Sequence, residues 1–281
     1  MRIDSHQHYW KVDRGDYHWM TPQVPVLYRD YLPGDLRPLL LQHGIQKTIL
    51  VQAAQTIAET DFLLELALAD DSIAGVVGWL DMDSSGFPEQ FERYRKCAKF
   101  IGIRPMLQDV PDDDWILRPR VLDALRLLAS ADFPFEFLTY PRHLPFVLQV
   151  LELVPGLRPV VDHISKPEIR IGKLEPWKRC IAQAARYTNL HCKLSGMITE
   201  ADHRHWSAND LHPYVEHVME CFGIDRVMFG SDWPVCLLAG NYDQVIQTLR
   251  NLLSPILNED AERKLFGTNA ARFYKLDVEA Q

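Results

Sequence analysis

Short runs rich in β-branched and aromatic residues alternate with segments of helical periodicity along the whole chain. Parallel strands need crossover connections, which are usually helices, so this alternation predicts a parallel sheet with helices outside it. The predicted strands cover residues 2–6, 47–52, 74–80, 100–105, 133–138, 159–163, 190–195 and 226–231. Eight strands, with a helix after nearly every one, predict a closed (β/α)8 barrel of the TIM type. A doubly wound open sheet is the competing interpretation.

The helical segments between the strands have recognisable ends. Asp35 is a candidate N-cap for a helix that ends at Gly44. Further helices are predicted over residues 61–69, 120–131, 144–153, 176–187, 211–222 and 260–273. Residues 10–31 carry few helical signals, and we expect them to form a loop over the barrel mouth. No linker interrupts the 281 residues, so we expect a single barrel domain over residues 1–281.

Charge and cysteine content exclude several classes of protein. The net charge is −8 and no run of Lys and Arg is present, which argues against a nucleic-acid partner. The five cysteines contain no Cys-x-x-Cys pair, which indicates reduced thiols. The first residues lack the apolar stretch of a signal peptide, and no apolar run is long enough to span a bilayer. We therefore expect a cytoplasmic protein that binds no membrane, and the oligomeric state stays open.

The first predicted strand ends in a His-x-His pair. Residues two apart on a strand point the same way, so His6 and His8 are expected to face the barrel interior together, with Asp4 on the same side. In a barrel, active sites lie at the carboxyl ends of the strands. Two imidazoles there can bind a metal or donate hydrogen bonds to a carbonyl oxygen. The alternative is a pair of core histidines bonded to their neighbours.

Two further strand ends carry ionisable groups. His163 ends the sixth predicted strand and is a third imidazole at the same mouth. Asp232 follows the eighth strand within Gly-Ser-Asp-Trp-Pro, which places a carboxylate across from the first strand of a closed barrel. The alternative role for Asp232 is that of a helix cap or turn residue. Together these residues predict an active site made of three imidazoles and one carboxylate.

Other polar residues near strand ends are candidates for substrate binding. Arg104 is costly to bury without an anion or a polar ligand, although an internal salt bridge would also explain it. Tyr140 can donate to a ligand or serve as a wall of the site. Lys193 can hold a substrate hydroxyl or carboxylate, or can pair with Glu136 of the fifth strand.

Aromatic side chains near the expected mouth are candidates for contact with a ligand. Trp233 follows the proposed carboxylate, and Trp19 lies in the expected loop over the barrel. We predict that both line the binding pocket. The alternative is that they serve only in core or loop packing.

The motifs as a set resemble the amidohydrolase superfamily. They are Asp-Ser-His-Gln-His-Tyr-Trp at 4–10, Asp-His at 162–163, Lys-Leu-Ser-Gly at 193–196, Gly-Ser-Asp-Trp-Pro at 230–234 and Gly-Thr-Asn-Ala-Ala-Arg at 267–272. The similarity runs from residue 3 to about 276. Within that superfamily, the motifs most resemble the amidohydrolase-2 branch and its sugar-lactonase group. This group includes the L-fuconolactonases, the L-rhamnonolactonases and pyrone-dicarboxylate lactonase. The resemblance implies a TIM-like barrel of the amidohydrolase type.

The chain departs from the metal-dependent members of this family at one position. Those members add a histidine on strand five to the first-strand pair and the strand-eight aspartate, and strand five has no histidine here. Only His6, His8 and Asp232 match the zinc ligands. A zinc ion completed by water can be held by these three. The lactonase group implies, however, that no cofactor needs to be bound.

The resemblance and the residues together lead to a mechanism for opening a sugar lactone, with L-fuconolactone or a similar deoxyhexonolactone as the expected substrate. Asp232 is assigned as the general base. The three histidines would donate hydrogen bonds to the carbonyl oxygen, while Arg104, Tyr140 and Lys193 would hold substrate hydroxyls.

Two alternative functions stay open. One is a zinc-dependent hydrolase or decarboxylase acting on a small carboxylate. The other is a barrel that binds sugar without catalysis. A serine hydrolase is disfavoured because no Gly-x-Ser-x-Gly is present, and a nucleotide-binding enzyme because the chain has no phosphate-binding glycine motif.

Overall fold

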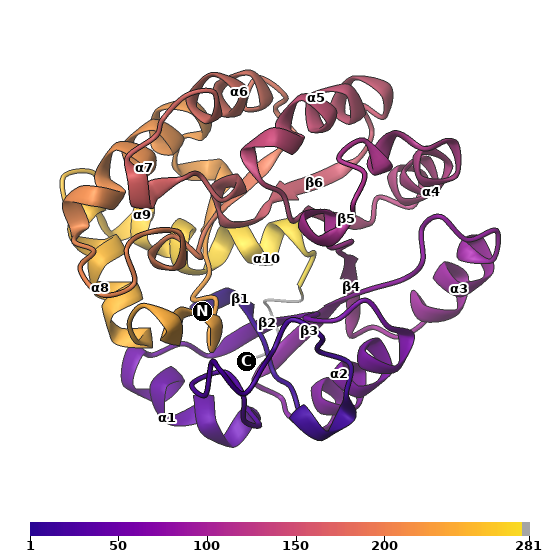
Figure 1. Cartoon of the computed structure of the whole chain (residues 1–281), viewed down its shortest axis with the longest axis horizontal. Coiled ribbons are helices and arrows are strands. Elements are labelled where there is room, and N and C mark those ends of the chain that lie inside the picture. Colours follow the sequence, from indigo (N-terminus) through magenta and orange to yellow (C-terminus); the bar gives the residue numbers. More distant parts are fainter. Residues whose placement is uncertain (277–281) are drawn as a thin grey trace.

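A computed structural model describes residues 1–276 and forms a parallel eight-stranded sheet whose order follows the sequence, β1 to β8 (Figure 1). The strands are β1 (Ile3–Gln7), β2 (Lys47–Val51), β3 (Ile73–Gly78), β4 (Phe100–Ile103), β5 (Pro134–Phe137), β6 (Arg158–Val161), β7 (His191–Leu194) and β8 (Val227–Phe229). The ends of β1 and β8 meet, since the Asp232 amide donates to the His6 carbonyl at 2.8 Å and the His8 amide to the Trp233 carbonyl at 2.7 Å. The predicted barrel is confirmed, and the open sheet is excluded.

Helices surround the sheet on the outside, as Figure 1 shows. They are α1 (Pro33–His43), α2 (Ile57–Ala69), α3 (Phe87–Tyr94), α4 (Pro119–Ser130), α5 (Leu144–Leu153), α6 (Trp177–Ala184), α7 (Ala208–Phe222), α8 (Tyr242–Leu253), α9 (Glu259–Arg263) and α10 (Asn269–Phe273). No helix was predicted from the sequence at the positions of α3 and α8. None of the helices in residues 1–276 combines the length and the apolar character needed to cross a membrane.

Asp35 has a different role from the one predicted. It is the third residue of α1, and its carboxylate accepts from the backbone amide of Leu32 at 2.9 Å, one residue before the helix. Pro33 occupies the first helical position, where its missing N–H costs nothing. The helix ends at Gly44 as predicted, because this glycine takes the left-handed conformation with φ +64°.

The end of the barrel where the strands begin is filled by apolar side chains. Inward-facing residues form one cluster with Phe273 of the C-terminal helix α10 and with Tyr274, the residue after it. The members from the strands are Ile3, Ile49, Val51, Val77, Ile101, Val160 and Met228. With this end closed by side chains, only the opposite end, where the strands terminate, is free to hold a ligand.

The strand β1 is irregular between Asp4 and Gln7, where its register against β2 shifts. The expectation that Asp4 shares the face of His6 is therefore wrong. The Asp4 carboxylate instead accepts from the hydroxyl of Tyr242 in the outer helix α8 at 3.0 Å, and from the amide of Ser231 at 2.9 Å. This contact fastens the end of β8 to the start of β1.

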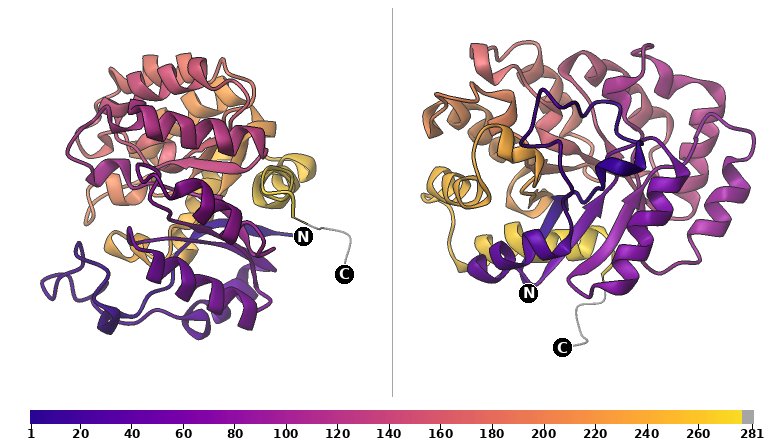
Figure 2. Two further views of the ribbon diagram at one scale, coloured as in Figure 1. Left: turned by 90° about the vertical axis from the view of Figure 1, so that its right-hand side faces the viewer. Right: turned by 60° about the horizontal axis from the view of Figure 1, so that its bottom comes forward.

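Residues 10–31 form a loop that contains one short 3-10 turn, Val12–Arg14, and crosses in front of the barrel in the right-hand view of Figure 2. Trp10 and Tyr31 exchange backbone hydrogen bonds at 2.9 and 3.0 Å, which close the base of the loop. The Trp19 indole donates to the Ala53 carbonyl after β2 at 2.8 Å. The predicted loop at the mouth is thus present and held by hydrogen bonds.

Candidate active site at the carboxyl ends of the strands

Three imidazoles surround one carboxylate oxygen at the barrel mouth. Asp232 Oδ1 lies 3.2 Å from His8 Nε2, 3.8 Å from His6 Nε2 and 3.9 Å from His163 Nε2. All four side chains are at most 5% exposed. The structure therefore brings together the four residues that the sequence analysis assigned to catalysis. We call this group the catalytic cluster.

Two residues of the cluster have an unusual backbone conformation. His163 and Asp232 have φ of +52° and +57°, a left-handed conformation that costs non-glycine residues free energy and concentrates at functional sites. Glycines make room for the rings. A Cβ at Gly196 would lie 2.5 Å from His163 Nδ1, and one at Gly230 would lie 2.6 Å from His6 Cβ. The glycines of the two motifs are thus needed for close approach.

Hydrogen-bond partners hold all three imidazoles in place. His8 Nδ1 lies 2.8 Å from the Val51 carbonyl oxygen, which can only accept, so Nδ1 carries a proton and Nε2 faces Asp232. His6 lies between two cationic donors, with Arg104 Nη1 3.2 Å from its Nε2 and Lys193 Nζ 3.2 Å from its Nδ1. The third ring is held through Nδ1, 2.8 Å from the Ser195 hydroxyl.

Two rings of the cluster, those of His6 and His163, are neutral, and its carboxylate is negative. Burial, followed by the nearby Lys193 ammonium, holds the pKa of His6 well below its ordinary value, and burial does the same for the pKa of His163. Burial alone would raise the pKa of Asp232, but His163 and His8 more than offset it, so this pKa lies below its ordinary value. A carboxylate is therefore available as a base at neutral pH.

A chain of buried charges lies beneath the cluster. Lys193 Nζ lies 2.7 Å from Glu136 Oε2 and 3.1 Å from Asp162 Oδ1, and Arg104 Nη1 lies 3.1 Å from Asp162 Oδ2. Tyr274 donates to the other oxygen of Glu136. Burial raises the pKa of Glu136 to about 7. Burial alone would also raise the pKa of Asp162, but Lys193 and His6 hold this pKa well below the ordinary range.

A cavity of about 200 Å³ opens above the cluster. We call it the catalytic cavity. Its walls are His8, Trp19, Ala53, Arg104, Met106, Gln108, Asp109, Leu138, His163, Lys166, Asp232, Val235 and Leu238. Drug-sized ligands occupy roughly 300–1,000 Å³, so this volume suits a smaller molecule. Lys166 was not predicted from the sequence, although it follows His163 by only three residues.

The structure changes the interpretation of three predicted substrate contacts. Lys193 is fully buried and pairs with Glu136, which was the alternative. Trp233 is 2% exposed and packs on Tyr31 with a ring separation of 5.0 Å, so it belongs to the core. Tyr140 lines a neighbouring pocket rather than the catalytic cavity. Arg104 and Trp19 do line the cavity, as predicted.

Glu59 supports the wall of the cavity from behind. Its carboxylate accepts from the backbone amides of Ala53 at 2.9 Å and Ala54 at 2.7 Å, and it is fully buried at the start of α2. Burial raises the pKa of Glu59 to about 8. No motif in the sequence indicates this role, because the contact joins a side chain of α2 to backbone amides that follow β2.

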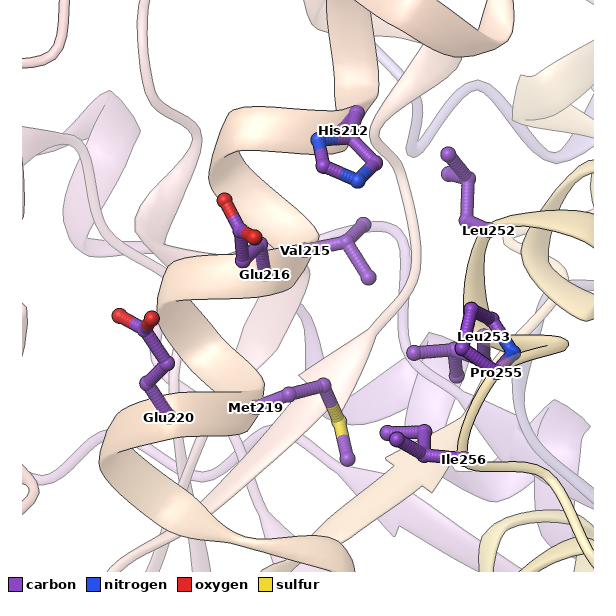
Figure 3. A pocket seen from close by; sticks show the side chains of 9 residues that line it. All are labelled: His212, Val215, Glu216, Met219, Glu220, Leu252, Leu253, Pro255 and Ile256. Atoms are coloured by element: carbon purple, nitrogen blue, oxygen red, sulfur yellow. The ribbon is translucent and has the colours of Figure 1, made fainter.

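Larger hollows elsewhere on the molecule lack comparable chemistry. Figure 3 shows one of about 380 Å³ between α7 and the end of α8. Val215, Met219 and Ile256 form its apolar walls, with His212 and Glu216 at the side of the helix. Volume therefore does not identify the site, whereas the convergence of buried ionisable groups does.

The catalytic cluster has a donor set that suits a divalent ion. Ligand atoms of His6, His8 and Asp232 lie within 4.8 Å of one another. The Nδ1–H of His8 is anchored on the Val51 carbonyl, as in most metal-binding histidines, so Nε2 is directed at Asp232. Two acceptor atoms 3.2 Å apart require a proton or a cation between them. Leu138, at the end of β5, offers no ligand, so three protein ligands and a water would complete a tetrahedral site.

Known proteins with similar sequences include three named lactonases. The chain is 40% identical over 279 residues to the L-fucono-1,5-lactonase of Burkholderia ambifaria, covering 98% of this chain and 96% of that protein. It is 37% identical over 290 residues to the L-fucono-1,5-lactonase of Burkholderia multivorans, with the same coverage of 98% and 96%. An L-rhamnono-gamma-lactonase of Scheffersomyces stipitis is 26% identical over 200 residues, which are 62% of this chain and 59% of that protein.

The chain is also similar to solved crystal structures. A crystal structure of an amidohydrolase from Burkholderia multivorans with bound zinc has a TM-score of 0.94 and 35% identity, and covers 99% of this chain and 100% of that one. A second crystal form with bound HEPES has a TM-score of 0.93 and 36% identity, with the same coverage of 99% and 100%. The family described as amidohydrolase matches residues 3–276. Because this match spans nearly the whole chain, the protein belongs to the amidohydrolase family.

Proposed function

We propose that the protein hydrolyses a small sugar lactone to its aldonic acid, with L-fucono-1,5-lactone or a similar deoxyhexonolactone as substrate. The observation that carries this proposal is the ionised Asp232, buried among three imidazoles at the floor of a cavity of about 200 Å³. Relatives at 40% and 37% identity that are named L-fucono-1,5-lactonase support the choice of substrate.

Asp232 is positioned to act as the general base. Its Oδ1 is directed at the imidazoles, and no hydrogen bond from residues 1–276 reaches Oδ2. A water on Oδ2 gives its proton to the carboxylate as its oxygen attacks the lactone carbonyl carbon. When the bond to the ring oxygen breaks, the protonated carboxyl returns that proton to the ring oxygen. The products are a free hydroxyl and a carboxylic acid, which ionises at neutral pH.

His163 and Arg104 act on the charge that develops at the carbonyl oxygen. His163 lines the cavity and is neutral, so an N–H at Nε2 can donate to the oxyanion while Nδ1 accepts from Ser195. The Arg104 guanidinium, which also lines the cavity, supplies positive charge. A divalent ion held by His6, His8 and Asp232 would polarise the same carbonyl and lower the pKa of a bound water.

The test follows proton release from a panel of L- and D-aldonolactones by purified protein, before and after treatment with a chelator. Rapid hydrolysis of 1,5-lactones by the chelator-treated protein is expected if Asp232 and the imidazoles suffice for catalysis. Hydrolysis that returns only with added zinc would assign His6, His8 and Asp232 as metal ligands while keeping the lactonase activity. Saturable binding without turnover in both states would refute the proposal in favour of a non-catalytic barrel.

A further inference from the structure

Lys166 lies between the catalytic cavity and a second hollow. It lines the catalytic cavity and also an outer pocket of about 430 Å³. The outer pocket is lined by Tyr140, Pro141, Arg142, Lys166, Glu168, Lys173, Pro176 and Glu200. Among residues 1–276, Lys166 is the only side chain common to both linings. A long flexible cation at this position can reach into either space.

The backbone at Lys166 has a conformation that costs free energy. Four consecutive non-glycine residues, 163 to 166, have φ between +46° and +63°. Such residues cost free energy individually, so a run of four persists only where the surroundings enforce it. The Lys166 amide donates to the His163 carbonyl at 2.8 Å, which closes the turn. The same turn therefore sets both the third catalytic imidazole and the Lys166 side chain.

The Lys166 ammonium has few partners. Its Nζ lies 3.8 Å from Glu200 Oε1 and 5.6 Å from the centre of the Tyr140 ring. Neither is a hydrogen bond, and none from Nζ is formed within residues 1–276. Yet the side chain is only 17% exposed. Three N–H donors are therefore held near the cavity with one distant counter-charge.

The other cations near the cluster are already engaged. Arg104 donates to Asp162, His6 and the Gln52 carbonyl. Lys193 is fully buried between Glu136 and Asp162 and does not reach the cavity. Arg104 keeps one buried donor, Nε, without a partner within residues 1–276, whereas all three donors of Lys166 are available to a ligand at the cavity wall.

We propose that Lys166 is a substrate-binding residue that donates hydrogen bonds to the hydroxyl groups of the sugar lactone, with Glu200 as its partner when the cavity is empty. This inference rests on the proposed lactonase function. The ligand group that it recognises is a hydroxyl of the sugar rather than the ester. The contact is made equally in the bound substrate and in the transition state, so its loss is expected to raise KM and leave kcat nearly unchanged.

The test compares two substrates in the variant Lys166→Met. One is L-fucono-1,5-lactone, and the other is δ-valerolactone, which has the same ring and ester but no hydroxyls. A hydrogen bond to a charged donor predicts a rise in KM of about 10- to 100-fold for the sugar lactone, with kcat within about threefold. The kcat/KM for δ-valerolactone is expected to stay within about twofold of the wild-type value, and Lys166→Arg to recover most of the affinity.

Lys173→Met is the matched control. Lys173 lines the same outer pocket and pairs with Glu168 at 2.5 Å, but does not line the catalytic cavity, so neither substrate is expected to change. An equal loss on both lactones in Lys166→Met would overturn the inference and assign Lys166 a supporting role for His163 or Asp232. Unchanged KM for the sugar lactone would also overturn it. If the wild-type protein hydrolyses neither lactone, the proposed function itself fails, which is a different result.

Discussion

Replacing Lys193 with Met tests whether this lysine holds the barrel together or holds the substrate. The Lys193 ammonium lies 2.7 Å from Glu136 and 3.1 Å from Asp162, and all three side chains are fully buried. Methionine has a similar length without the charge. The variant leaves two buried carboxylates beneath the catalytic cluster, with Arg104 as the remaining cation on Asp162.

The expected cost follows from this geometry. Removing one partner of a buried ion pair typically destabilises a protein by about 3–5 kcal/mol. Glu136 reduces this cost by taking up a proton, since its pKa is already raised to about 7 and loses its stabilising cation in the variant. A carboxyl with a raised pKa stabilises the fold while protonated, and this contribution is lost as pH rises through the folded-state value. We therefore expect a loss of about 3 kcal/mol at pH 8 and about half of that at pH 5.

The assay is urea unfolding of the wild type, Lys193→Met, Glu136→Gln and the double variant at both pH values. The double variant is expected to recover at least half of the loss, because the second buried charge is gone. A loss below about 1 kcal/mol at pH 8, or no coupling between the two substitutions, would refute the pairing. Because Lys193 does not line the cavity, KM for the lactone should change less than about threefold even where kcat falls.

Three further predictions concern the catalytic cluster and its supports. Asp232→Asn is expected to lower kcat by about 10²- to 10⁴-fold, the range for a general base, and near-normal turnover in the proton-release assay would contradict the assignment. Glu59 has a pKa raised from 4.5 to about 8, so the stability that it contributes is complete below about pH 4.5 and is lost as pH rises towards 8. The midpoints of urea unfolding at pH 5 and pH 8 should therefore differ less in Glu59→Gln than in the wild type. An unchanged difference would contradict this contribution of Glu59. Gly196→Ala should lower kcat by tenfold or more, since the new Cβ lies 2.5 Å from His163 Nδ1. Gly172→Ala has a similar φ of +63° with nothing within 4 Å, and should lose only stability, so equal kcat losses would argue against a specific clash.

The fold was largely readable from the sequence because each strand–helix unit carries its own local signal. All eight strands lie within a few residues of their predicted positions. The missed helices were readable in part. In α8, Val245, Ile246 and Leu249 follow the Asn241 cap at helical spacing, and in α3 the residues Phe87 and Phe91 are four apart. The register shift in β1 was not readable, because a bulge depends on the neighbouring strand.

The site was readable to the extent that its residues stand at strand ends. His8, His163 and Asp232 were identified because each ends a strand signal with an ionisable group. The support from Asp162 was not readable, and that from Glu136 was readable only as one of two roles for Lys193, since the partners lie more than 25 residues apart in the sequence. For the same reason the sequence left the two roles of Lys193 equally open.

Depth along the strand separates these roles once the strand bounds are known. Arg104, Leu138 and His163 come after the last residue of β4, β5 and β6, and all three line the cavity. Lys193 and Glu136 lie inside β7 and β5, one layer lower, where parallel neighbours place charged side chains against each other instead of against a ligand. His6 follows the same rule, because it lies inside β1 and does not line the cavity. Lys166 lies furthest beyond a strand of all these residues, and this position gives it access to the catalytic cavity, which the deeper Lys193 lacks.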